Sequence, residues 1–248
     1  MNAGDDERSP GAVGARVYST WFLRMYDVGV LGFNNHVAWR CPTSRILEHY
    51  NEFVSGNHLE AGVGTGWFLD HCQFPVPDPR IGLIDLNEST LQTASTRLSR
   101  YAPETHQADL LEPVHVQTDP FDSLGLCYLL HCLPVDPAQK TQVVPNLRSL
   151  LNPGAVVFGA TVLGDQAGHN TVGRLMMWGL NRTGVFSNRD DTVEILTTGI
   201  EEHLDLVSLE IVGRVALFAG RLRPGTADPD HPDRRTERHA APKRPGSG

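Results

Sequence analysis

The sequence lacks the features that identify membrane and secreted proteins. No stretch reaches the roughly 18 to 20 consecutive apolar residues of a membrane-spanning helix, so we expect no membrane partner. The opening residues, MNAGDDERSP, are acidic and contain no apolar run, unlike a secretory signal peptide. We therefore expect a cytoplasmic protein.

Cysteines and clustered basic residues are also scarce. The 248 residues include four cysteines, none in a C-x-x-C pair, which excludes a disulfide framework. Two His–Cys dipeptides, at 71–72 and 131–132, do not predict a metal site, because adjacent residues rarely chelate one tetrahedral ion. The formal net charge is −8, and the body of the chain has no run of Lys or Arg. We therefore expect no metal and no nucleic-acid partner.

Both ends of the sequence are poor in large apolar groups. Residues 1–14 are rich in Gly and charged side chains, and residues 224–248 are rich in Pro and charged side chains. Such segments bury too little apolar surface to offset the chain entropy lost on folding. We predict two disordered tails that flank one large α/β domain at residues 15–223.

Between these tails, strand-like and helix-like segments alternate. We predict strands at residues 57–61, 81–85, 105–108, 121–130, 155–163, 206–212 and 215–222. We predict helices at residues 17–28, 42–54 and 66–72, after Asn87, at 136–151 with a break at Pro145, around 175–178, and at 191–203. This order predicts a seven-stranded, mainly parallel sheet with helices on both faces, ending in an antiparallel hairpin.

A glycine-rich turn, E-A-G-V-G-T-G at residues 60–66, lies between a predicted strand and a predicted helix. Glycines at alternate positions allow a tight turn and let a ligand approach the backbone. A dinucleotide fingerprint, G-x-G-x-x-G, that began at Gly62 would need its third glycine at position 67, which is Trp67. The spacing therefore disfavours a nicotinamide dinucleotide.

Acidic residues stand at the ends of successive predicted strands. Glu60 ends the first, Asp85 ends the second and Asp109 follows the third. A carboxylate after the second strand can accept hydrogen bonds from both hydroxyls of a ribose. Asp109 could accept from an adenine amino group, with Leu86 and Leu110 against the faces of the base. Ligands of parallel sheets bind at this edge. The position of Asp85 alone also fits NAD, and the alternative for each single acid is a helix cap or a solvated turn residue.

These motifs resemble those of class I methyltransferases that depend on S-adenosyl-L-methionine (SAM). Residues 60–66 are similar to motif I, Asp85 to the ribose-binding acid of motif II, and Asp109-Leu110 to the adenine-side motif. Residues 121–134 resemble motif IV of the methyltransferase type 11/12 group. Residues 151–154, L-N-P-G, resemble the later L-x-P-G-G segment, with Ala155 in place of its second glycine. The resemblance covers about residues 15–223.

The resemblance implies a Rossmann-like fold with an N-terminal helical lid at about residues 15–55. It implies methyl transfer from SAM, leaving S-adenosyl-L-homocysteine (SAH), to a small molecule such as a natural product or metabolite. The acceptor atom (O, N or C) and the choice between monomer and homodimer stay open. No N-P-P-Y or D-P-P-Y tetrapeptide, typical of nucleic-acid and glutamine methyltransferases, follows the fourth predicted strand. The predicted cofactor-binding residues are Glu60, Gly62, Gly64, Thr65, Gly66, Asp85, Leu86, Asp109 and Leu110.

His131 is the candidate catalytic residue. It follows the fourth predicted strand, beside the expected methyl donor, and histidine titrates near neutral pH. It can therefore act as a general base or only shape the pocket. Tyr18 and Tyr26 are candidates for the substrate pocket, and simple packing is the alternative for both. Two other functions stay open: a SAM-binding protein without methyl transfer (a cyclase-like protein or an inactive partner subunit), and an NAD(P)-dependent oxidoreductase, which Trp67 and Asp109 disfavour.

Overall fold

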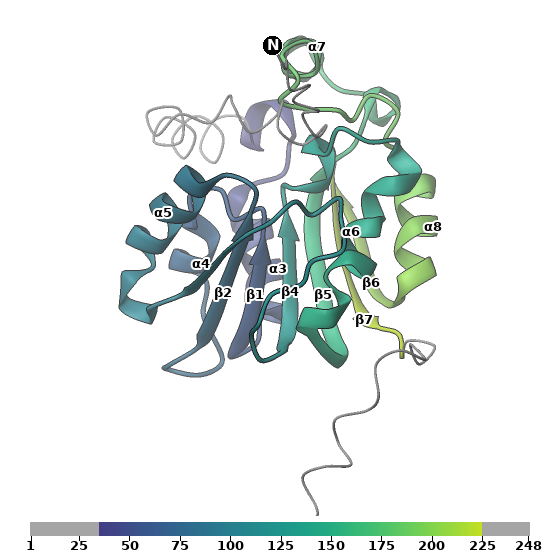
Figure 1. Ribbon diagram of the computed structural model, residues 1–248. Helices are drawn as coiled ribbons and strands as arrows, with labels where there is room; N and C mark the ends of the chain where they lie inside the picture. Colours follow the sequence, from purple (N-terminus) through teal and green to yellow (C-terminus); the bar gives the residue numbers. More distant parts are fainter. Residues whose placement is uncertain (1–34, 225–248) are drawn as a thin grey trace, which may run out of the picture.

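A single sheet organises the computed structural model, which describes residues 35–224 (Figure 1). Its seven strands have the order β3-β2-β1-β4-β5-β7-β6. Their bounds are β1 Asn57–Ala61, β2 Arg80–Asp85, β3 Glu104–Gln107, β4 Phe121–Cys127, β5 Leu151–Val162, β6 Leu204–Val212 and β7 Val215–Leu222. Strands β1 to β5 pair in parallel, whereas β7 is antiparallel to β5 and β6. The predicted mainly parallel sheet with its terminal hairpin is confirmed.

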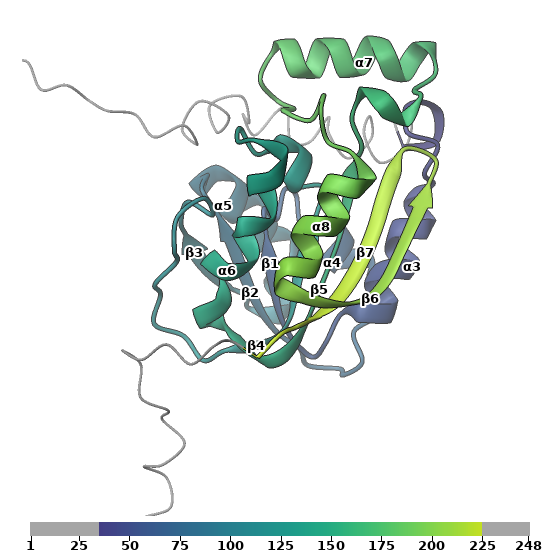
Figure 2. The same cartoon turned by 90° about the vertical axis from the view of Figure 1, so that its right-hand side faces the viewer.

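Helices cover both faces of this sheet. One face carries α3 (Thr43–Phe53), α4 (Trp67–His71) and α5 (Glu88–Arg97), and the other carries α6 (Val143–Asn146) and α8 (Val193–His203). Helix α7 (Thr171–Arg182) lies across the end of the sheet at which β1 to β5 finish (Figure 2). Short 3-10 helices are η2 Ser99–Tyr101, η3 Leu130–Cys132, η4 Pro137–Gln142, η5 Arg148–Leu150 and η6 Asp165–Ala167. None of the helices at residues 35–224 is long and apolar enough to cross a membrane.

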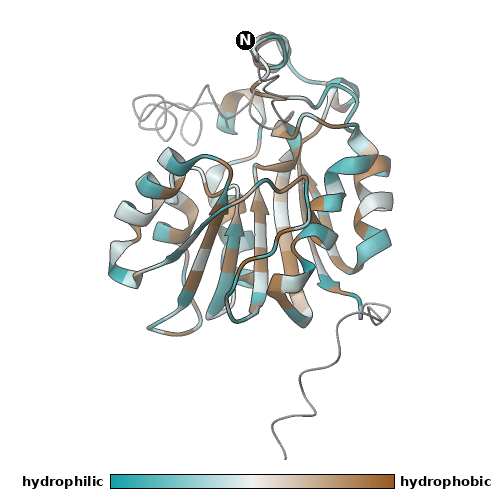
Figure 3. Ribbon diagram, viewed as in Figure 1, coloured by the Kyte–Doolittle hydropathy of each residue, from teal (hydrophilic) through white to brown (hydrophobic). Residues whose placement is uncertain are grey.

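Two hydrophobic cores form because the central strands are buried on both faces. Ile46 and Leu91 belong to the core under α3 to α5, and Leu147 and Ile200 to the core under α6 and α8. Each such side chain is fully or almost fully buried, which stabilises the fold by about 1.5 to 3 kcal/mol. Figure 3 shows the apolar residues gathered along the strands, with polar residues on the outer sides of the helices.

The segments around β4 and β5 differ from the prediction. Strand β4 ends at Cys127 rather than at residue 130, because Tyr128 adopts a positive φ of 58° and η3 follows it. Strand β5 begins at Leu151, so residues 152–154 lie within a strand instead of ending a helix; an irregular register near Phe121 accommodates them. The helix predicted at 136–151 is divided into η4, α6 and η5, and Pro145 lies in the short α6, as its predicted break implies.

Helix α3, which falls within the predicted lid range of 15–55, packs on the face of the sheet. Its residues Ile46, His49 and Tyr50 are buried, and Nε2 of His49 lies 2.9 Å from the carbonyl oxygen of Phe218 in β7. The rest of the predicted lid, including Tyr18 and Tyr26, and the predicted tail at residues 1–14 lie outside the described residues. So does the predicted C-terminal tail beyond Pro224.

Candidate cofactor and acceptor site

The glycine-rich turn joins β1 to α4 at the carboxyl edge of the sheet. Gly62, Gly64 and Gly66 have φ values of 68°, 56° and 73°, the left-handed region that glycine adopts without strain. A Cβ on Gly62 would lie 2.6 Å from Cδ1 of Leu129, whereas a Cβ on Gly64 would meet no atom of residues 35–224 within 4 Å. Within this part of the chain, the middle of the turn therefore leaves room for a ligand to approach its backbone.

The next two acids lie on neighbouring strands at the same edge. Asp85 ends β2, and its Oδ1 accepts a hydrogen bond of 2.8 Å from the backbone N–H of Asn87. Burial raises the pKa of Asp85 to about 6. Asp109 follows β3, and its Oδ1 accepts a hydrogen bond of 3.0 Å from the N–H of Leu111. Because the order is β3-β2-β1, the structure brings both acids and the glycine-rich turn to one edge.

The remaining predicted cofactor residues are less accessible. Leu86 is half-buried, but Thr65 and Leu110 are almost fully buried, and Leu110 packs in the core under α6. Glu60 is also buried, so its carboxylate does not lie on an open surface. Tyr50 donates a hydrogen bond of 2.6 Å to Oε1 of Glu60. Glu60, Thr65 and Leu110 therefore present little side-chain surface to a ligand, whereas Leu86 is partly exposed, as is the neighbouring Asp85.

Sequence reasoning missed the partners that hold Glu60. Nε2 of His58 lies 2.9 Å from Oε2 of Glu60, and Gly125 of β4 lies directly opposite, where a Cβ would collide with that oxygen. Burial, with Cys127 and Glu60 beside it, raises the pKa of the Tyr50 hydroxyl, which stays a proton donor. His58 could have been found, because residues two apart on a strand share a face.

Tyr128 is a second residue that the sequence did not single out. Its left-handed backbone is uncommon for a non-glycine residue and costs on the order of 1 kcal/mol or more. Hydrogen bonds hold it there: its N–H donates to the carbonyl oxygen of Ala160 at 2.7 Å, and its hydroxyl donates to Oδ1 of Asn35 at 2.8 Å. The turn after β4 thereby places Leu129 over Gly62, next to the predicted cofactor edge.

His131 lies in η3, but it is buried rather than open. Its Nδ1 accepts a hydrogen bond of 3.2 Å from the N–H of Val162, and its ring packs edge-on against Phe186. Burial and the charge of Lys140 lower the pKa of His131 to about 3. A group with this pKa is a weak proton acceptor near neutral pH. This environment does not suit a general base at neutral pH, and a role of His131 in shaping the pocket stays a prediction.

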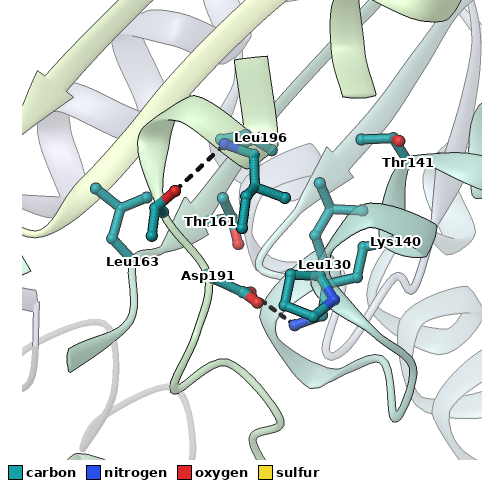
Figure 4. A pocket seen from close by; sticks show the side chains of 10 residues that line it. Leu130, Lys140, Thr141, Thr161, Leu163, Asp191 and Leu196 are labelled. Atoms are coloured by element: carbon teal, nitrogen blue, oxygen red, sulfur yellow. Dashed lines mark hydrogen bonds and ion pairs between the residues drawn. The ribbon is translucent and has the colours of Figure 1, made fainter. Parts of the chain in front are cut away.

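A buried ion pair lies next to His131. Nζ of Lys140 in η4 donates 2.6 Å hydrogen bonds to Oδ2 of Asp191 and to the carbonyl oxygen of Ser187. Both charged side chains line a small pocket together with Thr161 of β5 and Leu196 of α8 (Figure 4). Ser187 also donates its N–H to the carbonyl oxygen of His131 at 2.8 Å. The pair thus fastens the segment between α7 and α8 to the turn after β4.

Metal chemistry has no support in this part of the chain. Residues 35–224 contain no group of three His, Cys, Asp or Glu side chains placed to hold one ion. The four cysteines are all free thiols, and three of them are buried. The features that the edge offers a ligand are the backbone of the glycine-rich turn and the carboxylates of Asp85 and Asp109.

Comparison with known proteins identifies the family. A family model described as a methyltransferase domain matches residues 59–157. Demethylluteothin O-methyltransferase from Streptomyces thioluteus is 36% identical to this chain over 201 residues, which are 81% of this chain and 87% of that protein. The chain belongs to the class I SAM-dependent methyltransferases. The methyltransferase is also 33% identical over 212 residues to the physcion biosynthesis cluster O-methyltransferase from Aspergillus chevalieri, covering 85% of this chain and 95% of that one.

A solved structure supports the fold of the methyltransferase. The N-methyltransferase NodS from Bradyrhizobium japonicum, in complex with SAH, superposes with a TM-score of 0.51 at 21% identity. The match covers 73% of this chain and 85% of that chain. The predicted Rossmann-like architecture is confirmed, and membership of this family sets aside the oxidoreductase alternative.

Proposed function

We propose that the methyltransferase transfers a methyl group from SAM to a hydroxyl group of a small molecule of secondary metabolism. The choice of acceptor is supported by two relatives, which are named as O-methyltransferases of demethylluteothin and of physcion biosynthesis. When bound, SAM supplies a methyl group that its sulfonium already activates. The protein has to bind the donor, orient the acceptor and exclude water.

We infer that the donor binds along the carboxyl edge of β1, β2 and β3. One observation carries this inference: the glycine-rich turn, Asp85 and Asp109 all lie at the same edge of the sheet. In this assignment the backbone of residues 62–66, backed by Glu60, holds the methionine end of SAM. Asp85 accepts hydrogen bonds from the ribose hydroxyls, and Asp109 accepts one from the adenine amino group.

The low pKa of His131 limits which hydroxyl groups the enzyme can methylate. A histidine with a pKa near 3 is too weak a base to remove the proton of an ordinary alcohol. We therefore infer an acidic hydroxyl, such as a phenol or an enol, which loses its proton readily and needs mainly orientation. His131 is 1% exposed, and its ring packs against that of Phe186 at 4.4 Å between centroids, so its part is to hold the turn after β4 in place.

Two measurements test this function. Calorimetry should detect binding of SAM and SAH, with no heat from NAD(H). Incubation with SAM and a panel of phenols, enols, amines and aliphatic alcohols should release SAH with a phenol or enol, and mass spectrometry should show one added methyl group. Methylation of amines alone would contradict the hydroxyl assignment. Tight binding of NAD(H) without SAM binding would contradict the cofactor assignment.

A further inference from the structure

Polar side chains, buried except for the half-buried Ser55, form a continuous hydrogen-bonded chain that leads to Glu60. Ser55 precedes β1, and its Oγ lies 2.8 Å from Oγ of Ser123 in β4. Oγ of Ser123 lies 2.8 Å from Nδ1 of His58, whose Nε2 lies 2.9 Å from Oε2 of Glu60. His58 and Glu60 are 0% and 4% exposed in their side chains. These hydrogen bonds connect the residues before β1 with Glu60, the penultimate residue of β1.

The donors in this chain can be assigned one by one. The hydroxyl of Ser55 donates to the carbonyl oxygen of Asn57 at 2.8 Å, which uses its single proton. The hydroxyl of Ser123 must then donate to Ser55, which uses the proton of Ser123. Toward His58, Ser123 is therefore left only as an acceptor, so Nδ1 of His58 carries a proton and donates it.

The contact between His58 and Glu60 then needs one more proton. With Nδ1 already protonated, a neutral imidazole has only a lone pair at Nε2, which would face a carboxylate lone pair at 2.9 Å. An additional proton must therefore reside on Nε2 or on Glu60, and the pair as a whole is electrically neutral. Such neutrality is expected at this depth, because an unpaired buried charge is costly.

Other titratable groups beside the pair do not supply or remove this proton. They are Tyr50 from α3, Cys72 after α4 and Cys127 from β4, each of which interacts with Glu60. Burial raises the pKa of Cys72 to about 12 and holds the pKa values of Tyr50 and Cys127 well above their ordinary values. All three keep their protons at neutral pH. The hydroxyl of Tyr50 also donates to Oε1 of Glu60, which suits an ionised carboxylate.

We propose that His58 is a buried imidazolium that holds Glu60 as a carboxylate and thereby positions the glycine-rich turn for the cofactor. Both carboxylate oxygens of Glu60 are held, one by Tyr50 and the other by His58, above the space left by Gly125. The turn begins two residues later at Gly62. His58 is a positioning residue, and its effect on the cofactor rests on the proposed function of this turn.

The protonation of His58 can be measured directly in the wild-type protein. Nitrogen-15 NMR of the histidine-labelled protein at pH 7.5 should show the His58 ring with both nitrogens protonated, as in imidazolium. The assignment uses loss of that signal in His58→Gln. A signal of a neutral ring, with one nitrogen unprotonated, would overturn the proposal. This measurement needs no cofactor, so it stays decisive even if the proposed SAM binding fails.

Binding of SAH tests the positioning role. His58→Gln cannot carry a charge, so it leaves Glu60 unpaired. At pH 8 the SAH dissociation constant of His58→Gln should be at least about tenfold above that of the wild type, the result of losing roughly 1.4 kcal/mol. The double variant His58→Gln/Glu60→Gln should melt at a higher temperature than His58→Gln, because it removes the buried charge that the single variant leaves uncompensated. His115→Gln, on an exposed histidine, is the matched control and should behave as wild type.

The results separate the two proposals. Unchanged SAH affinity in His58→Gln at pH 8 would overturn the positioning role. A double variant less stable than His58→Gln would also overturn it. If Glu60 carries an uncompensated charge in His58→Gln, removing that charge should raise the stability. A wild-type protein that binds no SAH would contradict the proposed function instead, and the NMR signal would still decide the charge of His58.

Discussion

Cofactor binding should weaken in mild acid because of Asp85. This carboxyl ends β2 at the predicted ribose position, and burial raises its pKa to about 6. Only the ionised form can accept hydrogen bonds from two ribose hydroxyls at once, since a protonated carboxyl uses one oxygen as a donor. The affinity for SAH should therefore follow the ionised fraction of Asp85 as the pH falls.

The size of the effect follows from that pKa. With the protonated form binding weakly, the dissociation constant should be about 1.1-fold above its limit at pH 7, about twofold at pH 6 and about elevenfold at pH 5. The change between pH 7 and pH 5 is thus about tenfold, or roughly 1.4 kcal/mol. Asp85→Asn cannot ionise, so its affinity should be low by about tenfold or more at pH 7 and should not change in this way.

Calorimetric titration of SAH between pH 5 and pH 8 measures this dependence. Asp78→Asn, on an exposed aspartate before β2, removes the same charge away from the edge and should keep the wild-type profile. A flat wild-type profile, or the same acid limb in Asp85→Asn, would refute the ribose assignment.

Ionisation of Asp85 should favour SAH binding but lower the stability of the ligand-free protein. Its folded pKa lies above the unfolded value, so its contribution to stability is full below about pH 4 and is lost as the pH rises through about 6. Asp85→Asn should therefore raise the melting temperature of the ligand-free protein at pH 7.5 while it weakens SAH binding.

Three further predictions concern the ion pair, His131 and the tails. Lys140→Met should destabilise the fold by about 3 to 5 kcal/mol by leaving Asp191 buried and unpaired; Lys140→Met/Asp191→Leu should recover most of this in urea unfolding, and equal loss in both variants would contradict the ion-pair argument. His131→Asn should change KM more than kcat, and any fall of kcat at acidic pH should remain. If the variant loses this pH dependence and its kcat falls by about a hundredfold or more, the scale of a general base, His131 is a general base after all. A chain trimmed to residues 15–223 should keep its melting temperature and SAH affinity, because the removed segments carry few large apolar side chains, and a clear loss of either would show that a tail docks.

Much of this fold could be predicted because its signals are local. Alternation of strands and helices, the glycines after β1 and the Asn87 cap of α5 are each visible within a few residues. The end of β4 could not be predicted, because the left-handed Tyr128 has no sequence signature outside Gly, Asn and Asp. The start of β5 is hidden for a related reason: Asn-Pro-Gly commonly ends a helix, and only the pairing with Phe121 shows that it continues a strand.

The acidic residues at the edge of the sheet could be predicted from the sequence, but the contacts of the buried residues next to them could not. Asp85 and Asp109 follow from where parallel strands end, which the order of elements already implies. The setting of Glu60 depends on Tyr50 from a helix and Gly125 from a strand far along the chain, and no spacing rule connects these. The low pKa of His131 similarly depends on its burial under a segment that follows α7. Tertiary contacts, rather than local pattern, therefore determine the electrostatics of this site.

The position of β7 bears on how the protein matures on the ribosome. This strand lies between β5 and β6, and its Phe218 contacts His49 of α3, which is 169 residues earlier in the chain. While the chain is being synthesised, α3 emerges long before the strand that completes its packing. Contacts between such distant segments form slowly, and the intermediate exposes apolar surface until they do. Chaperone binding to nascent chains should therefore persist until β7 has left the exit tunnel.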